Sequence, residues 1–566
     1  MFDDVYPLYP ARAIHRLDGI WDFNWLGDMA NDDVDPQSLV YDDVQAVPGV
    51  FDTGLDLCNV RGVGVYRREV VCAGGAMRVV VAGLGLYGRI FLDGKMIGEY
   101  RTPYAEVAYD FEAAAGRHDL QILVDNRFRS HGPEVAHAYD DFYVFGGIYR
   151  SVSLQSLPDA RVERVVVTTL DLATGRVRLA IKLGGRIGKE VRVGIGFDKA
   201  EPKAHVLPVA DGQAVVECEV PDFKLWSPES PNLHVVTVTL DGGDAIVERF
   251  GIRTVATRSG QILLNGKPVR LLGVCRHESH PEFGPVQPDH LALDDLRILR
   301  ELGCNYIRCV HYQHNSAFLD LCDRMGFLVW EESLGWGSLP VDAQDPGTSA
   351  LAVLSTERMV NCHINHPSII IWAFLNEGCD NTQEGHRWYG EIASAIRSID
   401  GSRLVSYASM HKDHGICYDL ADVIAINAYP AWFAGNEACH QHYLSFVRPE
   451  VDRLAAWFSQ PEYADKPLIM SEIGVCALWG CHDYGRAQWS EEFQSDYFGE
   501  ACRSILENPR YAGLSLWQML DTKTYVNHGP IRGKPRGMNC AGLVDEYRRP
   551  KLAFQTVASL YRKKWL

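Results

Sequence analysis

The 566-residue sequence has two successive patterns of apolar residues, which predict a multidomain chain: two β-sandwiches followed by a (β/α)8 barrel. Up to about residue 255, short alternating apolar runs are broken by Gly, Pro and Asp, as in strands that bury one face. After that point, short apolar runs alternate with helical stretches, which is typical of a parallel sheet or barrel. Nowhere do about 18 apolar residues run uninterrupted, so we expect no membrane-spanning helix.

The first two units are predicted from their strands. Residues 1–155 contain runs such as MRVVVAGLGLYGRIFLDGKMIGEY, in which Asp93-Gly94 marks a hairpin turn between two strands. Residues 156–255 continue the alternation in ARVERVVVTTLD and LHVVTVTLDGGDAIVERF, with the loop LWSPESPNL between strands. A second sandwich of about 100 residues has the size of an immunoglobulin-like domain.

Residues 256–566 are predicted to form the barrel. Helical patterns such as DDLRILREL, SAFLDLCDRM and GHRWYGEIASAIRSI separate the apolar runs. Eight strand ends in about 300 residues match a (β/α)8 barrel in number and size. A doubly wound sheet is the alternative, but no Gly-x-Gly-x-x-Gly turn follows the first strand, which disfavours a dinucleotide site. The candidate strand ends are Arg276, Val310, Glu332, Glu377, Ser409, Asn427, Glu472 and Trp517.

Charge and cysteine content indicate the setting. The formal net charge of −18 and the absence of a clustered basic stripe argue against a nucleic-acid or anionic-membrane partner. The first residues carry early acids and no apolar core of signal-peptide length. The 15 cysteines are scattered and never spaced as Cys-x-x-Cys, which fits reduced thiols. We therefore expect a soluble, cytoplasmic protein.

Four histidine pairs share the spacing His-x-x-His, and each could form half of a metal site. No third ligand at motif spacing accompanies any of them, so we interpret these histidines as hydrogen-bonding or site-lining groups. The pairs are His277/His280, His311/His314, His363/His366 and His411/His414.

Two glutamates fall where a barrel places its chemistry, at the carboxyl ends of strands. The segment NHPSIIIWAFLNEG delivers Asn376 and Glu377, and KPLIMSEIG delivers Glu472. Glycosidic cleavage needs a proton donor to the leaving oxygen and a second acid that attacks the anomeric carbon. Either glutamate alone could be a strand-end acid in a salt bridge, but the joint pattern favours a glycosidase.

With these motifs in place, the chain resembles glycoside hydrolase family 2, whose members include β-galactosidases, β-glucuronidases and β-mannosidases. The resemblance covers nearly the whole chain and implies a jelly-roll sandwich, an immunoglobulin-like sandwich and a catalytic barrel, in this order. It is closest to the compact β-glucuronidase branch. The segments that carry it, besides the two above, are LVDN at 123–126, DFYVFGGIYRSVSL at 141–154, GVCRHESHPEFG at 273–284 and DDLRILRELGCNYIRCVHYQHN at 294–315.

The resemblance implies a role for each matching residue. Glu377 would be the general acid/base and Glu472 the nucleophile of a retaining, two-step hydrolysis. Asn376 would hold the 2-hydroxyl of the sugar. Tyr429 would orient the nucleophile, and a packed strand-end tyrosine is the alternative. For Asp141, from the first sandwich, the family pattern implies a contact with a sugar hydroxyl, and a simple loop acid is the alternative.

The remaining candidates line the expected sugar site. Arg276, His277 and His311 end the first two barrel strands, and Trp517 would be a sugar platform at the eighth strand. Some family members bind a metal ion beside the sugar, but the mechanism requires none, so we expect no cofactor and activity that survives a chelator. Homo-oligomers are common in the family, and nothing in the sequence locates an interface.

The identity of the sugar depends on the loop DTKTYVNHGPIRGKPRGMNCAGLVDEYRRPK. In the β-glucuronidase branch, an Asn-x-Lys motif clamps the sugar carboxylate; here Asn539 is kept and Ala541 replaces the Lys. The loop is rich in cations, which are either solvated or include a relocated clamp, for which Arg532 or Arg536 is our choice.

A relocated clamp would suit a uronide other than glucuronide, so β-galacturonide is our leading substrate. A neutral β-galactoside is the first alternative, because losing the Lys also accommodates an uncharged hydroxymethyl group. A β-glucuronidase with an altered clamp is the second. A carbohydrate-binding protein without catalysis is a further alternative, which the retention of Asn376, Glu377 and Glu472 disfavours.

Overall fold

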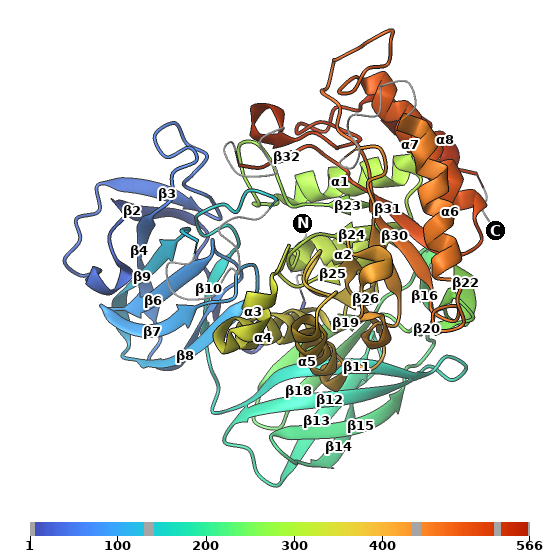
Figure 1. Cartoon of the computed structure of the whole chain (residues 1–566). Helices are drawn as coiled ribbons and strands as arrows, with labels where there is room; N and C mark the ends of the chain where they lie inside the picture. Colours follow the sequence, from blue (N-terminus) through green and yellow to red (C-terminus); the bar gives the residue numbers. More distant parts are fainter. Residues whose placement is uncertain (1–5, 129–140, 433–442, 526–533, 564–566) are drawn as a thin grey trace.

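The structure is a computed structural model that describes residues 6–128, 141–432, 443–525 and 534–563. Figure 1 shows three bodies: a blue N-terminal sandwich, a teal second sandwich, and a barrel that runs from green to red. The predicted fold class, two sandwiches and a (β/α)8 barrel, is confirmed. No helix among these residues is long and apolar enough to cross a membrane.

The N-terminal sandwich packs two antiparallel sheets against each other. Residues on its strands alternate between buried and exposed, as in β5, so the inner faces meet in one apolar core that includes Trp21, Tyr66 and Ile122. Asp93 and Gly94 both have positive φ, as the predicted hairpin turn requires. One sheet has the order β1 (Ile14–Arg16), β10 (Val152–Ser156), β5 (Gly75–Val81), β8 (Val107–Ala113). The other has the order β3 (Asp43–Val47), β2 (Gly19–Gly27), β4 (Val63–Cys72), β9 (Gly116–Asp125), β6 (Tyr87–Leu92), β7 (Lys95–Tyr100).

The second sandwich is smaller and also antiparallel. Its core is built from β-branched and aromatic residues on the inner faces, including Val177, Val236 and Phe250. The predicted loop LWSPESPNL contains a short hairpin, β16 (Trp226–Ser227) and β17 (Ser230–Pro231). The sheets are β11 (Ala160–Asp171), β12 (Arg176–Gly185), β15 (Gln213–Glu219), and β14 (Lys203–Pro208), β13 (Glu190–Phe197), β18 (His234–Leu240), β19 (Ala245–Phe250).

The barrel is a ring of parallel strands. Nine strand segments are hydrogen-bonded in the order β27-β26-β25-β24-β23-β31-β30-β29-β28, and β27 and β28 are separated only by Tyr407. Counting these two as one interrupted strand gives the eight strands that the sequence predicts. They are β23 (Leu271–Arg276), β24 (Tyr306–Cys309), β25 (Leu328–Glu332), β26 (Ile369–Ala373), β27 (Leu404–Ser406), β28 (Ala408–Ser409), β29 (Ile424–Asn427), β30 (Leu468–Ile473) and β31 (Tyr511–Leu516).

Helices cover the outside of the ring, as Figure 1 shows for α6, α7 and α8 beside β30 and β31. Their apolar faces join the outward side chains of the strands in the largest core of the chain. Local signals set their ends: Asn315 caps α2, and Gly326 ends it in the left-handed conformation. The helices are α1 (Asp289–Leu302), α2 (Ser316–Met325), α3 (Pro340–Gln344), α4 (Pro346–His363), α5 (Gln383–Ile399), α6 (Val447–Trp457), α7 (Glu491–Glu507) and α8 (Leu552–Tyr561).

Short elements precede and follow the barrel strands. A three-stranded sheet, β20 (Val255–Arg258), β21 (Gln261–Leu264) and β22 (Lys267–Val269), precedes β23 and packs its apolar residues against the barrel interior. After the last barrel strand, β32 (Thr522–Lys523) pairs with β33 (Met538–Asn539). The described 3-10 turns are η1 (Asn31–Asp33), η2 (Lys412–His414), η3 (Tyr418–Leu420), η4 (Tyr443–Phe446) and η6 (Pro535–Gly537).

Each sandwich contacts the barrel through an arginine, which is buried in the first sandwich and partly exposed in the second. Arg150, beside β10, donates to Glu278 (Nη2 to Oε2, 3.0 Å), which follows β23. On the second sandwich, Arg249 of β19 forms an ion pair with Asp320 of α2. Glu278 lies next to His277 at the carboxyl end of the barrel, whereas Asp320 lies on an outer helix. The first contact is therefore the one that bears on the candidate site.

Candidate active site

The two predicted glutamates emerge from neighbouring parts of the barrel end. Glu472 is the next-to-last residue of β30, and Glu377 lies four residues beyond β26, where its amide nitrogen donates to the Ala408 carbonyl (2.9 Å). Glu377 has a φ of 53°, a left-handed conformation that is costly for a residue with a side chain. Strain of this kind is retained at functional sites when the surrounding contacts impose it.

Arg308, on the inside of β24, joins the carboxylates of the site. Its guanidinium donates to Glu472 Oε1 (2.6 Å), to Glu332 Oε1 (2.7 Å) and to Asn376 Oδ1 (2.8 Å). The arginine is fully buried, so these charge-assisted hydrogen bonds lie in a medium that screens them weakly. A positive charge is therefore in direct contact with Glu472.

A second donor binds the other carboxylate oxygen of Glu472. The Tyr429 hydroxyl donates to Glu472 Oε2 at 2.5 Å. Burial, and next the negative charge of Glu472, raise the pKa of Tyr429 well above its usual value, so the phenol stays neutral and keeps its proton. Both oxygens of Glu472 are thus held by donors, which fixes the orientation of this carboxylate.

Glu377 is held differently. Asn427 Nδ2 donates to Glu377 Oε1 (2.9 Å) and to Asn376 Oδ1 (3.0 Å), and Ser471 Oγ donates to Asn427 Oδ1 (2.7 Å). A neutral amide is therefore the described donor to Glu377, in place of the arginine that reaches Glu472.

The surroundings of Glu377 change its proton affinity. Burial raises the pKa of Glu377 to about 8, helped by the negative charges of Glu472 and Asp141 and opposed by the Asn427 hydrogen bond. Glu377 is therefore protonated at neutral pH. A protonated acid beside a carboxylate that is held by a cation is the arrangement that general acid and nucleophile require.

Glu332 completes this network as a third carboxylate. Besides accepting from Arg308, it accepts from Trp330 Nε1 (2.8 Å) and bonds His311 Nδ1 (2.9 Å). Burial acts to raise its pKa, but Arg308 and His311 outweigh it and lower the pKa below the usual value. Glu332 therefore stays ionised and positions Arg308 and His311.

Aromatic rings line one side of the site. Trp517, just after β31, stacks on His311 with ring centroids 5.4 Å apart and 17° between the planes, and meets His277 edge-on at 5.7 Å. Phe142 of the first sandwich lies 5.1 Å from His277. Burial lowers the pKa of His277 well below its usual value, so this histidine is neutral.

The first sandwich also supplies a charge. Asp141 precedes Phe142 and forms an ion pair with Lys534 Nζ, although 393 residues separate the two in the sequence. The Asp141 carbonyl accepts from Thr524 Oγ1 (3.3 Å), which ties this segment to the loop after β31. The predicted approach of Asp141 to the barrel is thus present.

Two predicted site residues, Arg276 and Arg536, have partners away from the two glutamates. Arg276 points outward from β23 because strand residues alternate in direction: its guanidinium bonds Asp295 of α1 (2.8 Å) and lies over the Phe318 ring, so these contacts do not support a sugar-lining role. Arg536 is more than half exposed and pairs with Glu546 (3.4 Å), which does not support it as the carboxylate clamp. Arg532 lies outside the described residues.

Asn539 is buried near the site. Its Oδ1 accepts from the Ala541 amide (3.3 Å), which fixes the loop that would carry the family's Lys. Lys551 holds the same loop, because its buried Nζ donates to the Cys540 carbonyl (2.8 Å) and to Asp521 Oδ1 (2.7 Å).

Sequence reasoning missed four residues of this arrangement. It did not single out Arg308, Asn427 or Glu332 as site residues, although two of these end strands and Arg308 lies one residue before the end of β24. The position of a charged residue in an apolar strand was the available signal. Lys534 carried no such signal, because nothing in the sequence distinguishes it from the other cations of its loop.

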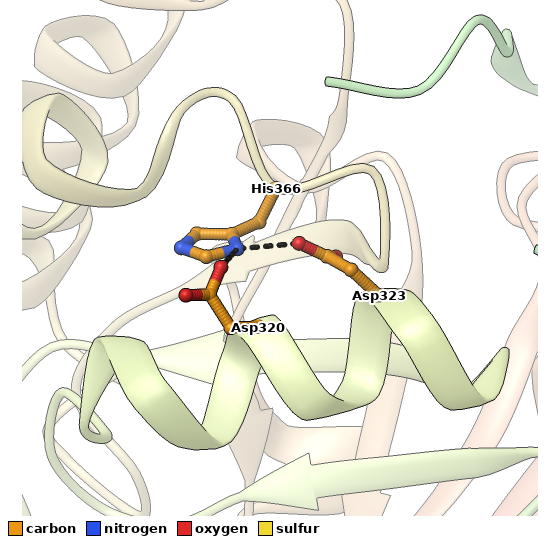
Figure 2. Close-up of side chains that lie close together, drawn as sticks. All are labelled: Asp320, Asp323 and His366. Carbon is orange, nitrogen blue, oxygen red and sulfur yellow. Dashed lines mark hydrogen bonds and ion pairs between the residues drawn. The ribbon is translucent and has the colours of Figure 1, made fainter. Parts of the chain in front are cut away.

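One cluster among the described residues has the composition of a metal site: Asp320, Asp323 and His366 (Figure 2). His366 Nδ1 lies 2.6 Å from Asp323 Oδ2 and 3.7 Å from Asp320 Oδ1. Arg249 pairs with Asp320 and would repel a cation there. We interpret the cluster as an ion-pair network between the second sandwich and α2.

In three of the four His-x-x-His pairs at least one histidine bonds a carboxylate, and in the fourth His277 bonds the Tyr312 hydroxyl. His311 bonds Glu332, His363 bonds Glu331 (2.8 Å) and His411 bonds Asp380 (2.5 Å). These contacts support their interpretation as hydrogen-bonding groups.

The barrel and its unequal pair of acids define the class of protein: a glycoside hydrolase. Family models agree. Residues 255–564 match the model "Glycosyl hydrolases family 2, TIM barrel domain", and residues 160–253 match "Glycosyl hydrolases family 2". The first match alone spans more than half of the chain. The chain therefore belongs to glycoside hydrolase family 2, as the sequence motifs predict.

Individual relatives point to β-glycosidases. The chain is 31% identical to a family 2 β-galacturonidase from Eisenbergiella tayi, whose crystal structure with galacturonate superposes with a TM-score of 0.88 and covers 98% of both chains. A β-glucuronidase of Streptococcus agalactiae is 24% identical over 99% of this chain and 98% of its own length. The β-glucuronidase of Mus musculus is 29% identical in an alignment that covers 75% of this chain and 64% of the mouse protein. The protein is thus a β-glycosidase at the level of the family.

Proposed function

We propose that this protein is a retaining exo-β-glycosidase that removes a terminal β-linked uronide, with β-D-galacturonide as its substrate. The observation that carries the reaction type is the unequal treatment of two acids. Glu377 has a raised pKa of about 8 and accepts from a neutral amide, whereas Arg308 and Tyr429 hold Glu472. One acid can then donate a proton while the other attacks.

In the first step, a Glu472 oxygen attacks the anomeric carbon while the bond from this carbon to the leaving oxygen breaks. Glu377 gives its proton to that oxygen, and the aglycone departs as an alcohol. In the second step, Glu377, now a carboxylate, takes a proton from water, whose oxygen attacks the anomeric carbon and breaks the bond to Glu472. Two displacements at one carbon retain the β configuration.

Asn376 fits the role of the 2-hydroxyl ligand. Its Oδ1 is occupied by Arg308 and Asn427, so the amide orientation is fixed. Its Nδ2 is buried and has no hydrogen-bond partner among the described residues. A buried donor left unpaired costs about 1–3 kcal/mol, which a sugar hydroxyl would recover. Such a bond strengthens as positive charge develops at the anomeric carbon.

The choice of sugar rests on two supports. Ala541 stands where the glucuronidase motif has its Lys, so the usual clamp for a glucuronide carboxylate is incomplete. The solved β-galacturonidase at 31% identity covers 98% of this chain. Together they favour a uronide that is held by a different cation.

A panel of p-nitrophenyl β-glycosides that carry galacturonate, glucuronate, galactose, glucose and mannose tests the proposal. We expect the highest kcat/KM for the galacturonide. A galactoside that exceeds it by about tenfold, equal to about 1.4 kcal/mol of transition-state preference, would contradict the uronide. NMR of the first product separates the mechanism from the sugar: an α-configured product would exclude retention whichever substrate is best.

A neutral β-galactoside is the second candidate, because Ala541 also leaves room for an uncharged hydroxymethyl group. A glucuronide held by an altered clamp is the third, and both are members of the same panel. We expect activity to survive EDTA, since no step above uses a metal.

A further inference from the structure

The carboxylate of a uronide needs a cation, and the loop after β31 holds the candidates. Among its described cations, Arg536 turns outward to Glu546. Lys523 lies over the Tyr143 ring, 3.9 Å from Nζ to the centroid, against the first sandwich. Lys534 is the remaining described cation between β31 and β33, and it is mostly buried, with 11% of its side chain exposed.

Lys534 faces the sugar side of the site. Its partner Asp141 is followed by Phe142, whose ring lies against His277 and within 6.0 Å of His311, the residue on which Trp517 stacks. The electrostatic effects of Lys534 and Asp141 also place this pair beside the candidate site. The Lys534 ammonium adds to the lowering of the His277 pKa, and the Asp141 carboxylate adds to the raising of the Glu377 pKa.

We propose that Lys534 is the residue that recognises the substrate carboxylate, with Asp141 accepting from the neighbouring sugar hydroxyl. The pair offers a donor beside an acceptor, contributed by two domains. The ammonium has three donor hydrogens and Asp141 takes one, which leaves donors for the sugar. This inference rests on the proposed uronide specificity and names the residue that confers it.

The pair also suits the galacto configuration. The 4-hydroxyl of a galacturonide is axial, on the same face of the ring as the carboxylate at C5, whereas in a glucuronide it lies on the opposite face. A compact ammonium can contact a carboxylate oxygen and a cis hydroxyl together, which a planar two-pronged clamp does less well. A lysine that approaches the carboxylate from the face of the axial 4-hydroxyl can therefore contact both groups of a galacturonide, whereas in a glucuronide the 4-hydroxyl lies on the other face.

The test compares kcat/KM for two substrates that differ only at C6, p-nitrophenyl β-D-galacturonide and β-D-galactoside. For Lys534→Met we expect a loss of about 100-fold on the galacturonide, as for the removal of one partner from a buried charge pair. The kcat/KM for the galactoside should change by less than about threefold, and this retained activity also shows that the variant is folded. Lys534→Arg should restore part of the galacturonide activity. Lys199→Met, an exposed lysine of the second sandwich, is the matched control and should leave both substrates unchanged.

A double variant distinguishes direct contact between Lys534 and the substrate carboxylate from neutralisation of Asp141 by Lys534. It is needed because Lys534→Met alone leaves Asp141 to repel a substrate carboxylate. If Lys534 only neutralises Asp141, Asp141→Asn with Lys534→Met returns the galacturonide-to-galactoside ratio to the wild-type value, and the proposal is overturned. If the ammonium contacts the carboxylate, the ratio stays low.

Two other outcomes overturn the proposal, and they differ in what else they affect. A wild-type protein that prefers galacturonide, with a Lys534→Met variant that loses both substrates equally or neither, rejects Lys534 while the proposed function stands. A wild-type protein that prefers galactoside rejects the proposed function and Lys534 with it.

Discussion

The floor and the rim of the site are built in different ways. The floor consists of residues on barrel strands or just beyond them, joined through one buried arginine: Arg308, Glu332, Asn376, Asn427 and Glu472. The rim consists of loop residues from two domains, Asp141 and Phe142 on one side and Lys534 on the other. The floor is fixed by the barrel alone, whereas the rim depends on how the first sandwich is seated.

This difference divides the two tasks of the site. The chemistry at the anomeric carbon needs acids at fixed positions, and strand ends in a closed barrel vary little in position. Selection among sugars needs side chains that can be substituted without moving those acids, and loop residues can be substituted in this way. We therefore expect floor variants to abolish turnover of every substrate and rim variants to alter the preference among substrates.

The largest expected effect is on the floor. Glu472→Gln removes the attacking oxygen anion and should lower kcat by about 10⁴-fold or more, with sugar binding retained. Initial rates on an aryl β-glycoside measure the first effect, and calorimetric titration with the free sugar measures the second. Glu331→Gln is the matched control, since Glu331 is also a buried strand-end acid but bonds His363. Unchanged turnover in Glu472→Gln would show that the floor does not carry the reaction.

Arg308→Lys tests whether one arginine organises the floor. Lysine keeps the charge but cannot donate to three separate side chains in a fixed plane, so Glu472 loses its position. We expect kcat/KM to fall by about 100-fold on charged and neutral sugars alike, with about 2 kcal/mol less stability toward urea. A loss confined to one substrate would place Arg308 in recognition of the sugar and blur the division between floor and rim.

The two domain contacts should differ in their effect on activity. Arg150→Met leaves Glu278 buried without its guanidinium, and should cost about 3–5 kcal/mol of stability and disturb the seating of the rim. Arg249→Met breaks the ion pair with Asp320 on the outer helix α2, and should reduce stability with little change in kcat/KM. Urea denaturation and kinetics below the transition of each variant compare them. Equal kinetic effects would mean that both sandwiches influence the site.

The smallest expected effect concerns pH and links the rim to the floor. Because Glu377 must be protonated to act as the acid, kcat/KM of the wild type should fall as pH rises through about 8. Asp141→Asn removes one of the negative charges that raise this pKa, so the basic limb should move to lower pH. A pH–rate profile of both proteins measures the shift. A limb that stays in place would show that the rim carboxylate does not act on Glu377.

The sequence by itself determined the fold class, the family and the two acids. Alternating runs gave the sandwiches and strand-helix repeats gave the barrel, because each pattern follows from local backbone geometry. Glu377 and Glu472 could be placed because strand ends in a barrel share one face, wherever they lie in the chain. The same regularity predicted the positions of Asn376 and Trp517, and the resemblance to the family added Tyr429.

Only the tertiary structure decided which charged side chains lie at the candidate site. Arg276 ends a strand like Glu472, yet its side chain points to α1 and bonds Asp295, because direction along a strand alternates with each residue. Arg536 and Lys534 lie two residues apart in one loop, and only their partners, Glu546 and Asp141, distinguish them. Asp141 comes from another domain, 393 residues away. No local pattern encodes such a contact, since it depends on how separately folded units dock.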